Sequence, residues 1–194
     1  FVFTGMGSAL FPMVFHVACF NVSFGHCPFF YLVCLLFYYF RSKITKILEE
    51  FFLLEIVDVV NISENDWKSH DNYILGCPTW WDGDLQSDWE DYFDTFKEIS
   101  FKGKKVALFG LGDQIGYEEW FCDGLGILGE IIVESEGEVL GFTIKDKSYE
   151  FECDTKAVKN DNLLWGLALD DDNQSNLSEY RIKNWVNQLV SEFK

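Results

Sequence analysis

Two segments, each following a short apolar run, most constrain what this chain can fold into. The first is PTWWDG at 78–83, which follows the run 73–77, and the second is GLGDQIGY at 110–117, which follows the run 106–109. Such runs indicate buried strands. In an open α/β sheet, ligands bind beyond the carboxyl ends of the strands, so both segments would lie at that edge. Each brings an aromatic ring and glycines that allow close backbone approach, as binding a flat ring requires.

Charge and length limit the class of protein. The 194 residues suit one domain with a full-sized core. Lys and Arg total 15 against 32 Asp and Glu, a net charge of −17. This excess argues against nucleic acid as a partner, because binding phosphates needs the opposite sign. A basic protein partner fits the charge, although solubility alone would also explain it.

Cysteine and histidine spacing indicates no metal site. The six cysteines show no C-x-x-C spacing and the three histidines show no metal-ligand spacing. Buried free thiols and a reducing compartment are expected. Neither a Ser/His/Asp nor a Cys/His arrangement is recognisable, so no catalytic residue is assigned. Three tryptophans are expected in the core: Trp120, Trp165 and Trp185.

The first 40 residues differ from the rest of the chain. Residues 1–40 contain no Asp, Glu, Lys or Arg and hold ten of the twenty Phe. Three interpretations remain open: a membrane anchor or uncleaved signal spanning 20–40, an atypical first strand with an unusual leader, or a translation artefact joined to a genuine domain. If residues 20–40 are an anchor, the following basic residues place the body on the cytoplasmic or stromal side. The expected domain therefore runs over 41–194.

The body alternates helix and strand patterns, which predicts a parallel α/β sheet. Helices are expected at 42–53, 63–70, 88–96 and 121–132, and strands at 56–60, 72–77 and 105–110. Residues 139–144 and 163–167 are expected to be two halves of one interrupted last strand. An amphipathic helix ends the chain, with Ser178 as its expected N-cap. Residues 29–37 are the candidate first strand, because a sheet without its central strand would be split.

Four stretches of the body resemble the long-chain flavodoxins. They are ILGCPTW at 74–80, GDLQSDWE at 83–90, GKKVALFGLGDQIGY at 103–117 and GLALDDDNQSNLSEYRIKNWVNQLVSEF at 166–193. The resemblance covers about 42–194. It implies a doubly wound α/β fold with a five-stranded parallel sheet of order 2-1-3-4-5. It also implies that the last strand is interrupted by the long-chain insertion, at about 143–162.

The resemblance also implies the cofactor and its site. FMN would lie with its ring between Trp80 and Tyr117. Further residues implied at the same site are Thr79, Gly83, Gly112, Asp113 and Asp172. Trp81 stands where the family usually has Asn, at a peptide that changes orientation when the flavin is reduced, which puts the energetics of that change in doubt.

One expected motif is missing. The family holds the FMN phosphate in a T-x-T-G-x-T loop at a helix N-terminus. Before the helix that starts near residue 42, the sequence reads LLFYYFR at 35–41, without glycine. Ser42 is the one nearby hydroxyl of the right kind and is the remaining candidate phosphate ligand.

The implied function is one-electron transfer by a low-potential FMN carrier rather than an enzyme with its own substrate. The implied partners are basic redox proteins such as ferredoxin–NADP reductase or photosystem I, and the body is expected to be monomeric. The alternative is a flavodoxin-like domain that has lost its phosphate loop, binds FMN weakly or not at all, and is a binding module or a non-functional product. The expected location is soluble, in a reducing cytoplasm or plastid stroma, with membrane contact confined to the anchor interpretation.

Overall fold

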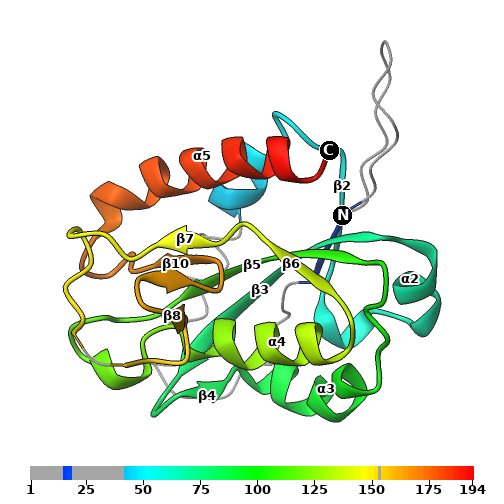
Figure 1. Ribbon diagram of the computed structural model, residues 1–194, viewed down its shortest axis with the longest axis horizontal. Helices are drawn as coiled ribbons and strands as arrows, with labels where there is room; N and C mark the ends of the chain where they lie inside the picture. The colour runs from blue at the N-terminus through cyan, green and yellow to red at the C-terminus, as the bar shows by residue number, and fades with distance from the viewer. Residues whose placement is uncertain (1–14, 19–41, 153) are drawn as a thin grey trace.

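The computed structural model describes residues 15–18, 42–152 and 154–194 (Figure 1). Its centre is a parallel sheet whose main strands are, in spatial order, β2 (Leu54–Val57), β1 (Phe15–Ala18), β3 (Asn72–Trp80), β5 (Lys105–Leu111) and β10 (Leu167–Leu169). The first strand along the chain lies between the second and the third. The predicted order 2-1-3-4-5 and the doubly wound α/β fold are therefore confirmed.

The central strand comes from a different segment than expected. Phe15–Ala18 pairs in parallel with Leu54–Val57 on one side and with the start of β3 on the other. Because this strand occupies the central position, the prediction that residues 29–37 supply it is wrong. Residues 29–37 lie outside the described residues, as does most of the 1–40 leader. The sheet thus takes its central strand from the segment that the sequence analysis separated from the domain.

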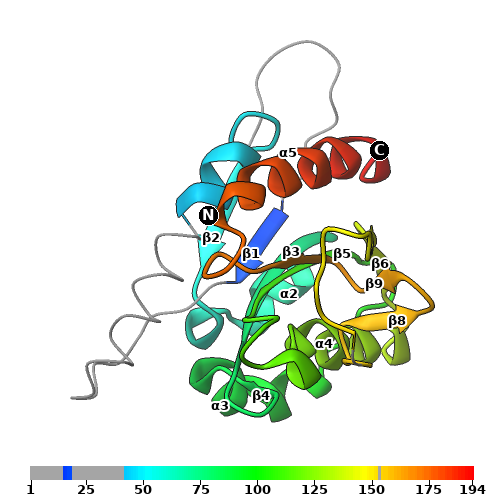
Figure 2. The ribbon, with the colours of Figure 1, turned by 90° about the vertical axis from the view of Figure 1, so that its left-hand side faces the viewer.

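Helices cover both faces of the sheet (Figures 1 and 2). One face carries α5 (Ser175–Glu192) and the helical residues 42–48, and the other carries α3 (Ser87–Lys97) and α4 (Asp123–Glu134). Three shorter elements are α2 (Glu64–Ser69) and the 3-10 turns η1 (Val59–Asn61) and η2 (Glu118–Trp120). The core between these layers includes Trp67, Trp89 and Trp185, each at most 3% exposed.

The last strand is interrupted, as predicted, but residues 143–144 and 163–164, expected as parts of its two halves, belong to the insertion's own sheet. β6 (Glu138–Leu140) pairs in parallel with the first half of β5, and β10 pairs in parallel with the second half. Between them, the insertion forms a small antiparallel sheet of β7 (Thr143–Ile144), β9 (Leu163–Leu164) and β8 (Val158–Asn160). The two halves therefore share one edge of β5, and the insertion leaves the main sheet between them.

Glycines in α4 are explained by close packing rather than by helix propensity. A Cβ on Gly126 would lie 2.0 Å from the carbonyl oxygen of Lys156, and one on Gly129 would lie 2.5 Å from the Trp165 ring. Glycine costs about 1 kcal/mol relative to alanine in a helix. Here the absence of side chains at these glycines lets the insertion lie directly against α4, which offsets that cost.

Three boundary predictions need correction. The helix expected at 42–53 ends at residue 48. The strand expected at 56–60 is β2, which ends at Val57 and is followed by a 3-10 turn. The last helix begins at Ser175, with Gln174 at its N-cap, so Ser178 is not the cap. Ser178 lies inside the first turn of the helix, and its hydroxyl donates to Oδ1 of Asp171, which precedes the helix, at 2.6 Å.

Candidate functional site

The two predicted loops lie side by side at one edge of the sheet. β3 and β5 are hydrogen-bonded neighbours whose pairing extends to Pro78 and Leu111. Trp80 is the last residue of β3, and Tyr117 follows β5 by six positions. Parallel strands place their carboxyl ends together. Both predicted rings therefore belong to loops at the same edge.

The first loop is a tight hairpin. Trp80 pairs with Asp84 in β4 (Asp84–Leu85), so the chain reverses over residues 81–83. Trp81 has φ +43° and Gly83 has φ +95°. A Cβ on Gly83 would lie 2.9 Å from the Trp120 ring and 3.0 Å from Asp123 Oδ2. Gly83 is thus required both by its backbone angle and by the close approach of its neighbours.

Trp81 is a non-glycine residue in the left-handed region. Such a conformation is uncommon for a bulky side chain and costs of order 1–3 kcal/mol. Its ring is 56% exposed, so packing of the ring explains little of the strain. The backbone of this turn is set by the hairpin rather than by the preference of residue 81.

The second loop is held by Asp113. Its Oδ1 accepts from the amides of Ile115 at 2.9 Å and Gly116 at 2.7 Å, and its carbonyl accepts from the Tyr117 amide at 3.1 Å. A carboxylate that accepts from the amides two and three residues later closes a turn. Asp113 therefore fixes the path of the chain to Tyr117, whose side chain is 39% exposed.

Gly112 and Thr79 contribute to local structure. The Gly112 amide donates to the Leu169 carbonyl at 3.0 Å, and a Cβ there would lie 3.0 Å from the Cys122 amide nitrogen. The Thr79 hydroxyl accepts from the Gly124 amide at 3.0 Å. At Gly112, the space for a side chain is taken by packing, whereas Thr79 is half-buried and its hydroxyl oxygen holds the Gly124 amide.

Sequence reasoning missed three residues beside this loop: Gln114, Asp170 and Asn173. Asp170 is fully buried, and its Oδ2 accepts from the backbone and side chain of Gln114, each at 3.1 Å, and from Asn173 Nδ2 at 2.9 Å. The Asn173 amide group also donates to Asp113 Oδ1 at 2.8 Å. All three lie within the stretches quoted for the resemblance, directly beside assigned residues.

The insertion contacts the second loop and a carboxylate beside the first. The Glu150 amide donates to Gln114 Oε1 at 2.7 Å, and the Glu152 amide donates to Glu118 just after Tyr117. The Lys156 amide donates at 2.7 Å to Asp123, the buried carboxylate next to Gly83. The insertion therefore holds Gln114 within the second loop, and Glu118 and Asp123 close to the two loops.

Asp172 and Ser42 lie in polar, exposed surroundings. Partial burial and the carboxylates of Asp170, Asp113 and Asp171 raise the pKa of Asp172. Ser42 is exposed and is the first described residue of the helix 42–48. The next residue, Lys43, lies 3.8 Å from Asp171 Oδ1. The stretch before Ser42, where the phosphate loop was expected, lies outside the described residues.

Three exposed side chains give the site an apolar surface: Trp81, Ile115 and Tyr117. Close by, Cys77 and Cys122 are free thiols, and burial raises the pKa of both far above the usual range. Such thiols are unreactive at neutral pH. Among the described residues, no group of three or more His, Cys, Asp or Glu is arranged to hold a metal ion. No helix in the described ranges is long and apolar enough to cross a membrane.

Known proteins resemble this chain in sequence and in structure. The flavodoxin family model matches residues 42–185. The flavodoxin of Synechococcus elongatus is 45% identical over 141 residues, 73% of this chain and 81% of that protein. Flavodoxin 1 of Escherichia coli is 41% identical over 138 residues, 71% of this chain and 77% of that protein. The flavodoxin of Fusobacterium nucleatum, solved bound to flavin mononucleotide, matches with a TM-score of 0.78 at 30% identity, covering 93% of this chain and 98% of that one. The chain belongs to the flavodoxin family.

Proposed function

We propose that this chain carries single electrons between redox proteins by means of FMN bound at the edge formed by the two loops. The observation that carries the proposal is the placement of Trp80 and Tyr117 on adjacent loops beyond two paired parallel strands. The FMN-bound relative from Fusobacterium nucleatum supports the choice of cofactor. In this role the chain is an electron carrier and not an enzyme with a substrate of its own.

The residues present suit a flavin ring. Trp80 and Tyr117 would hold its two faces, and the backbone of Gly83, Gly112 and Asp113 would line its edge. FMN itself supplies the electron-carrying chemistry. The protein's part is to bind the ring, exclude water and set the charge around it. The nearby carboxylates disfavour added negative charge on the ring, which lowers the potential at which the second electron is accepted.

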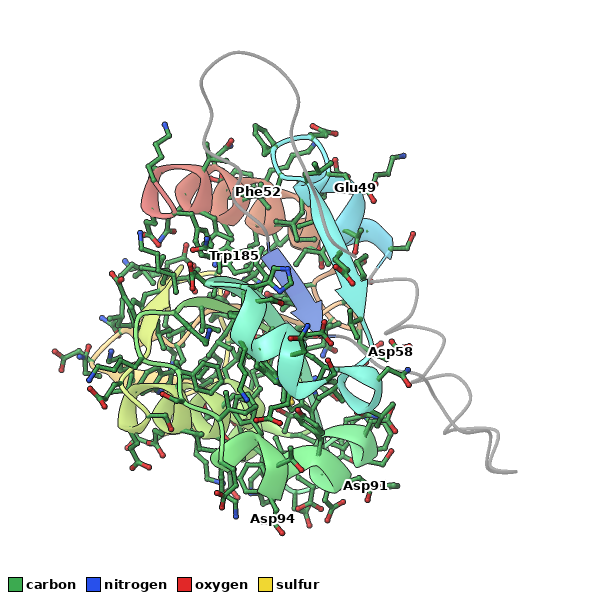
Figure 3. All side chains as sticks on the ribbon, turned by 90° about the vertical axis from the view of Figure 1, so that its right-hand side faces the viewer. Glu49, Phe52, Asp58, Asp91, Asp94 and Trp185 are labelled. Carbon is green, nitrogen blue, oxygen red and sulfur yellow. The ribbon has the colours of Figure 1, made fainter. Side chains whose placement is uncertain are left out.

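The acidic surface supports basic partners. The chain carries a net charge of −17, and Asp91 and Asp94 project outward from α3 (Figure 3). Ferredoxin–NADP reductase and photosystem I are the partners we propose. The free Cys77 and Cys122 support a reducing compartment, such as the cytoplasm or a plastid stroma.

The test is flavin titration of matched variants. Trp80→Ala and Tyr117→Ala should each weaken flavin binding, since aromatic contacts contribute about 0.5–1.5 kcal/mol beyond area burial. Both should also shift the one-electron potentials. Tyr180→Ala is the matched control, because Tyr180 is 67% exposed on α5. Wild-type affinity and potentials in both site variants would show that the rings do not hold the flavin.

A second candidate function remains, a flavodoxin-like domain that binds FMN weakly. The observation in its favour is the connection after the central strand. β1 ends at Ala18 and the next helix is described from Ser42, so residues 19–41 separate them. Nowhere in that stretch does the sequence read T-x-T-G-x-T. A binding module or a non-functional product would follow if the phosphate is not held.

A further inference from the structure

Gln114 joins the insertion to the loop that carries Tyr117. Its side chain is 1% exposed. Its Oε1 accepts from the Glu150 amide at 2.7 Å, and its Nε2 donates to Asp170 Oδ2 at 3.1 Å. One side chain therefore connects three segments: the loop after β5, the insertion, and the start of the last helix region.

The surroundings of Gln114 leave it little freedom. Asp170 is fully buried, and Gln114 supplies two of the donors that Oδ2 receives. A buried charge needs such partners, because an unpaired one costs several kcal/mol. The amide of Gln114 has a fixed orientation too, since its oxygen must face the Glu150 N–H and its nitrogen must face the carboxylate.

The loop turns around this fixed point. Gln114 faces inward, whereas its neighbour Ile115 is 56% exposed. Asp113 then closes the turn by accepting from Ile115, Gly116 and Tyr117. A displacement of Gln114 would therefore move the turn that ends at the Tyr117 ring.

We propose that Gln114 is a positioning residue through which the insertion sets the place of Tyr117. The insertion supports the loop from behind, and its hydrogen bond to Gln114 fixes where the loop lies. The consequence for flavin binding rests on the function proposed above, whereas the coupling of insertion and loop does not.

The chain offers a matched control in Gln174. It is also buried, at 6% exposed, and it contacts the same part of the insertion. Its Nε2 donates to the Ser148 carbonyl at 2.7 Å and to Glu150 Oε1 at 3.1 Å, and its Oε1 accepts from Arg181. Among the described residues, its side chain makes no hydrogen bond to 112–117. Gln174→Met therefore loosens the insertion from α5 and leaves the bond to the loop in place.

The experiment compares Gln114→Met with Gln174→Met by hydrogen exchange in the purified full chain, with and without riboflavin. In Gln114→Met, the Ile115, Gly116 and Tyr117 amides should exchange at least about tenfold faster, equivalent to about 1.4 kcal/mol. In Gln174→Met, they should stay within about twofold of the unmodified chain. No change in Gln114→Met, or an equal change in both variants, would overturn the proposal.

Two further readouts make the test complete. If Gln114→Met does not fold, the unmodified chain decides: the Glu150 and Gly116 amides should show protection factors within about tenfold of each other, and a larger gap would overturn the coupling. If the unmodified chain binds riboflavin, Gln114→Met should bind it at least about fivefold more weakly and Gln174→Met should not. Equal affinities would overturn the positioning role.

If the unmodified chain binds no flavin, the proposed function fails. The hydrogen-exchange data would still decide whether the insertion and the loop are coupled.

Discussion

The hydroxyl of Thr79 accepts a hydrogen bond from the backbone amide of Gly124 at 3.0 Å. Gly124 lies in the first turn of α4, where amides have no partner within the helix. The residue before this helix, Cys122, has φ +56° and provides no side-chain cap. The end of β3 therefore caps a helix that lacks a cap of its own, and a residue assigned to the flavin site also stabilises the fold.

Replacing Thr79 by Val should remove this cap. Loss of an N-terminal cap costs about 0.5–2 kcal/mol. Thr79→Val should therefore lower the free energy of unfolding by about 1 kcal/mol in urea denaturation, and Thr79→Ser, which retains the hydroxyl, should recover most of it. Equal stability of the Val and Ser variants would show that the hydrogen bond contributes nothing.

Strong local patterns made most of the fold predictable from the sequence. The buried runs of β3 and β5 and the order of the strands follow from apolar periodicity together with the resemblance. The central strand did not, because Phe15–Ala18 and residues 29–37 are both mostly apolar and contain no Asp, Glu, Lys or Arg, and pairing with β2 and β3 decides between them. The N-cap of α5 was also missed, because Ser178 has the right residue type but lies inside the first turn and bonds to Asp171, which precedes the helix.

The loops expected to form the site were recognisable in the sequence, whereas the buried contacts behind them were not. Trp80, Trp81 and Tyr117 belong to recognisable loop segments. Gln114 and Asp170 act through contacts with residues far away in the sequence, such as Glu150. No spacing rule reveals which segment of an insertion will fold back onto a loop, so this part of the site required the structure.

A second prediction concerns Trp185, which is 1% exposed and donates from Nε1 to the Gly141 carbonyl at 2.8 Å (Figure 3). Trp185→Phe removes that donor and leaves a buried carbonyl unsatisfied, at a cost of about 1–3 kcal/mol. Chemical denaturation should show this loss. Trp81→Phe is the control, because Trp81 is 56% exposed, and its effect should stay within about 0.5 kcal/mol. Similar losses in both variants would contradict the assignment.

The pH dependence of the free energy of unfolding should reveal the raised pKa of Asp172. Its pKa in the folded chain is raised by partial burial and by the Asp170, Asp113 and Asp171 carboxylates. The folded state therefore binds this proton more tightly than the unfolded chain does. The resulting stabilisation is present below the ordinary Asp pKa and is lost as pH rises through the raised pKa. At neutral pH, Asp172→Asn should increase stability by about 0.2–1 kcal/mol in urea denaturation, the scale of partly exposed charges.

Asp146 is the control of opposite sign. Hydrogen bonds from the Ser148 hydroxyl and amide, and more weakly the charge of Arg181, lower its pKa. Its contribution is present above the ordinary Asp pKa and is lost as pH falls through the lowered one. Asp146→Asn should therefore reduce stability at neutral pH. Changes of the same sign in the two variants would contradict this electrostatic account.

The acidic face of α3 should govern encounter with a basic partner. Asp91→Lys combined with Asp94→Lys should reduce the association rate with ferredoxin–NADP reductase by about tenfold at low salt. The difference should shrink as salt rises, because the Debye length is about 8 Å at physiological ionic strength. Glu49→Lys with Glu50→Lys is the matched control, since both residues are exposed and Glu49 lies away from Asp91 and Asp94 (Figure 3). Stopped-flow rates that are insensitive to salt, or equal in the two pairs, would remove the argument for docking at α3.

The last prediction concerns the phosphate. FMN carries nearly two negative charges there at pH 7, and the family holds them with a T-x-T-G-x-T loop that residues 19–41 lack. Each lost charge-assisted hydrogen bond is worth about 1.5–3 kcal/mol, so two or three would cost about two to six decades of affinity. Calorimetric titration should therefore find FMN bound little better than riboflavin.

Joining Ala18 to Ser42 through a T-x-T-G-x-T loop is the matching gain-of-function variant. The loop would follow β1 directly and lead into the helix 42–48, as a phosphate site at a helix N-terminus requires. FMN affinity should rise by at least about a hundredfold, whereas riboflavin affinity should change little, because riboflavin has no phosphate to bind. Tight binding of FMN over riboflavin by the unmodified chain would mean that other residues hold the phosphate, and would favour the electron carrier over the weak-binding alternative.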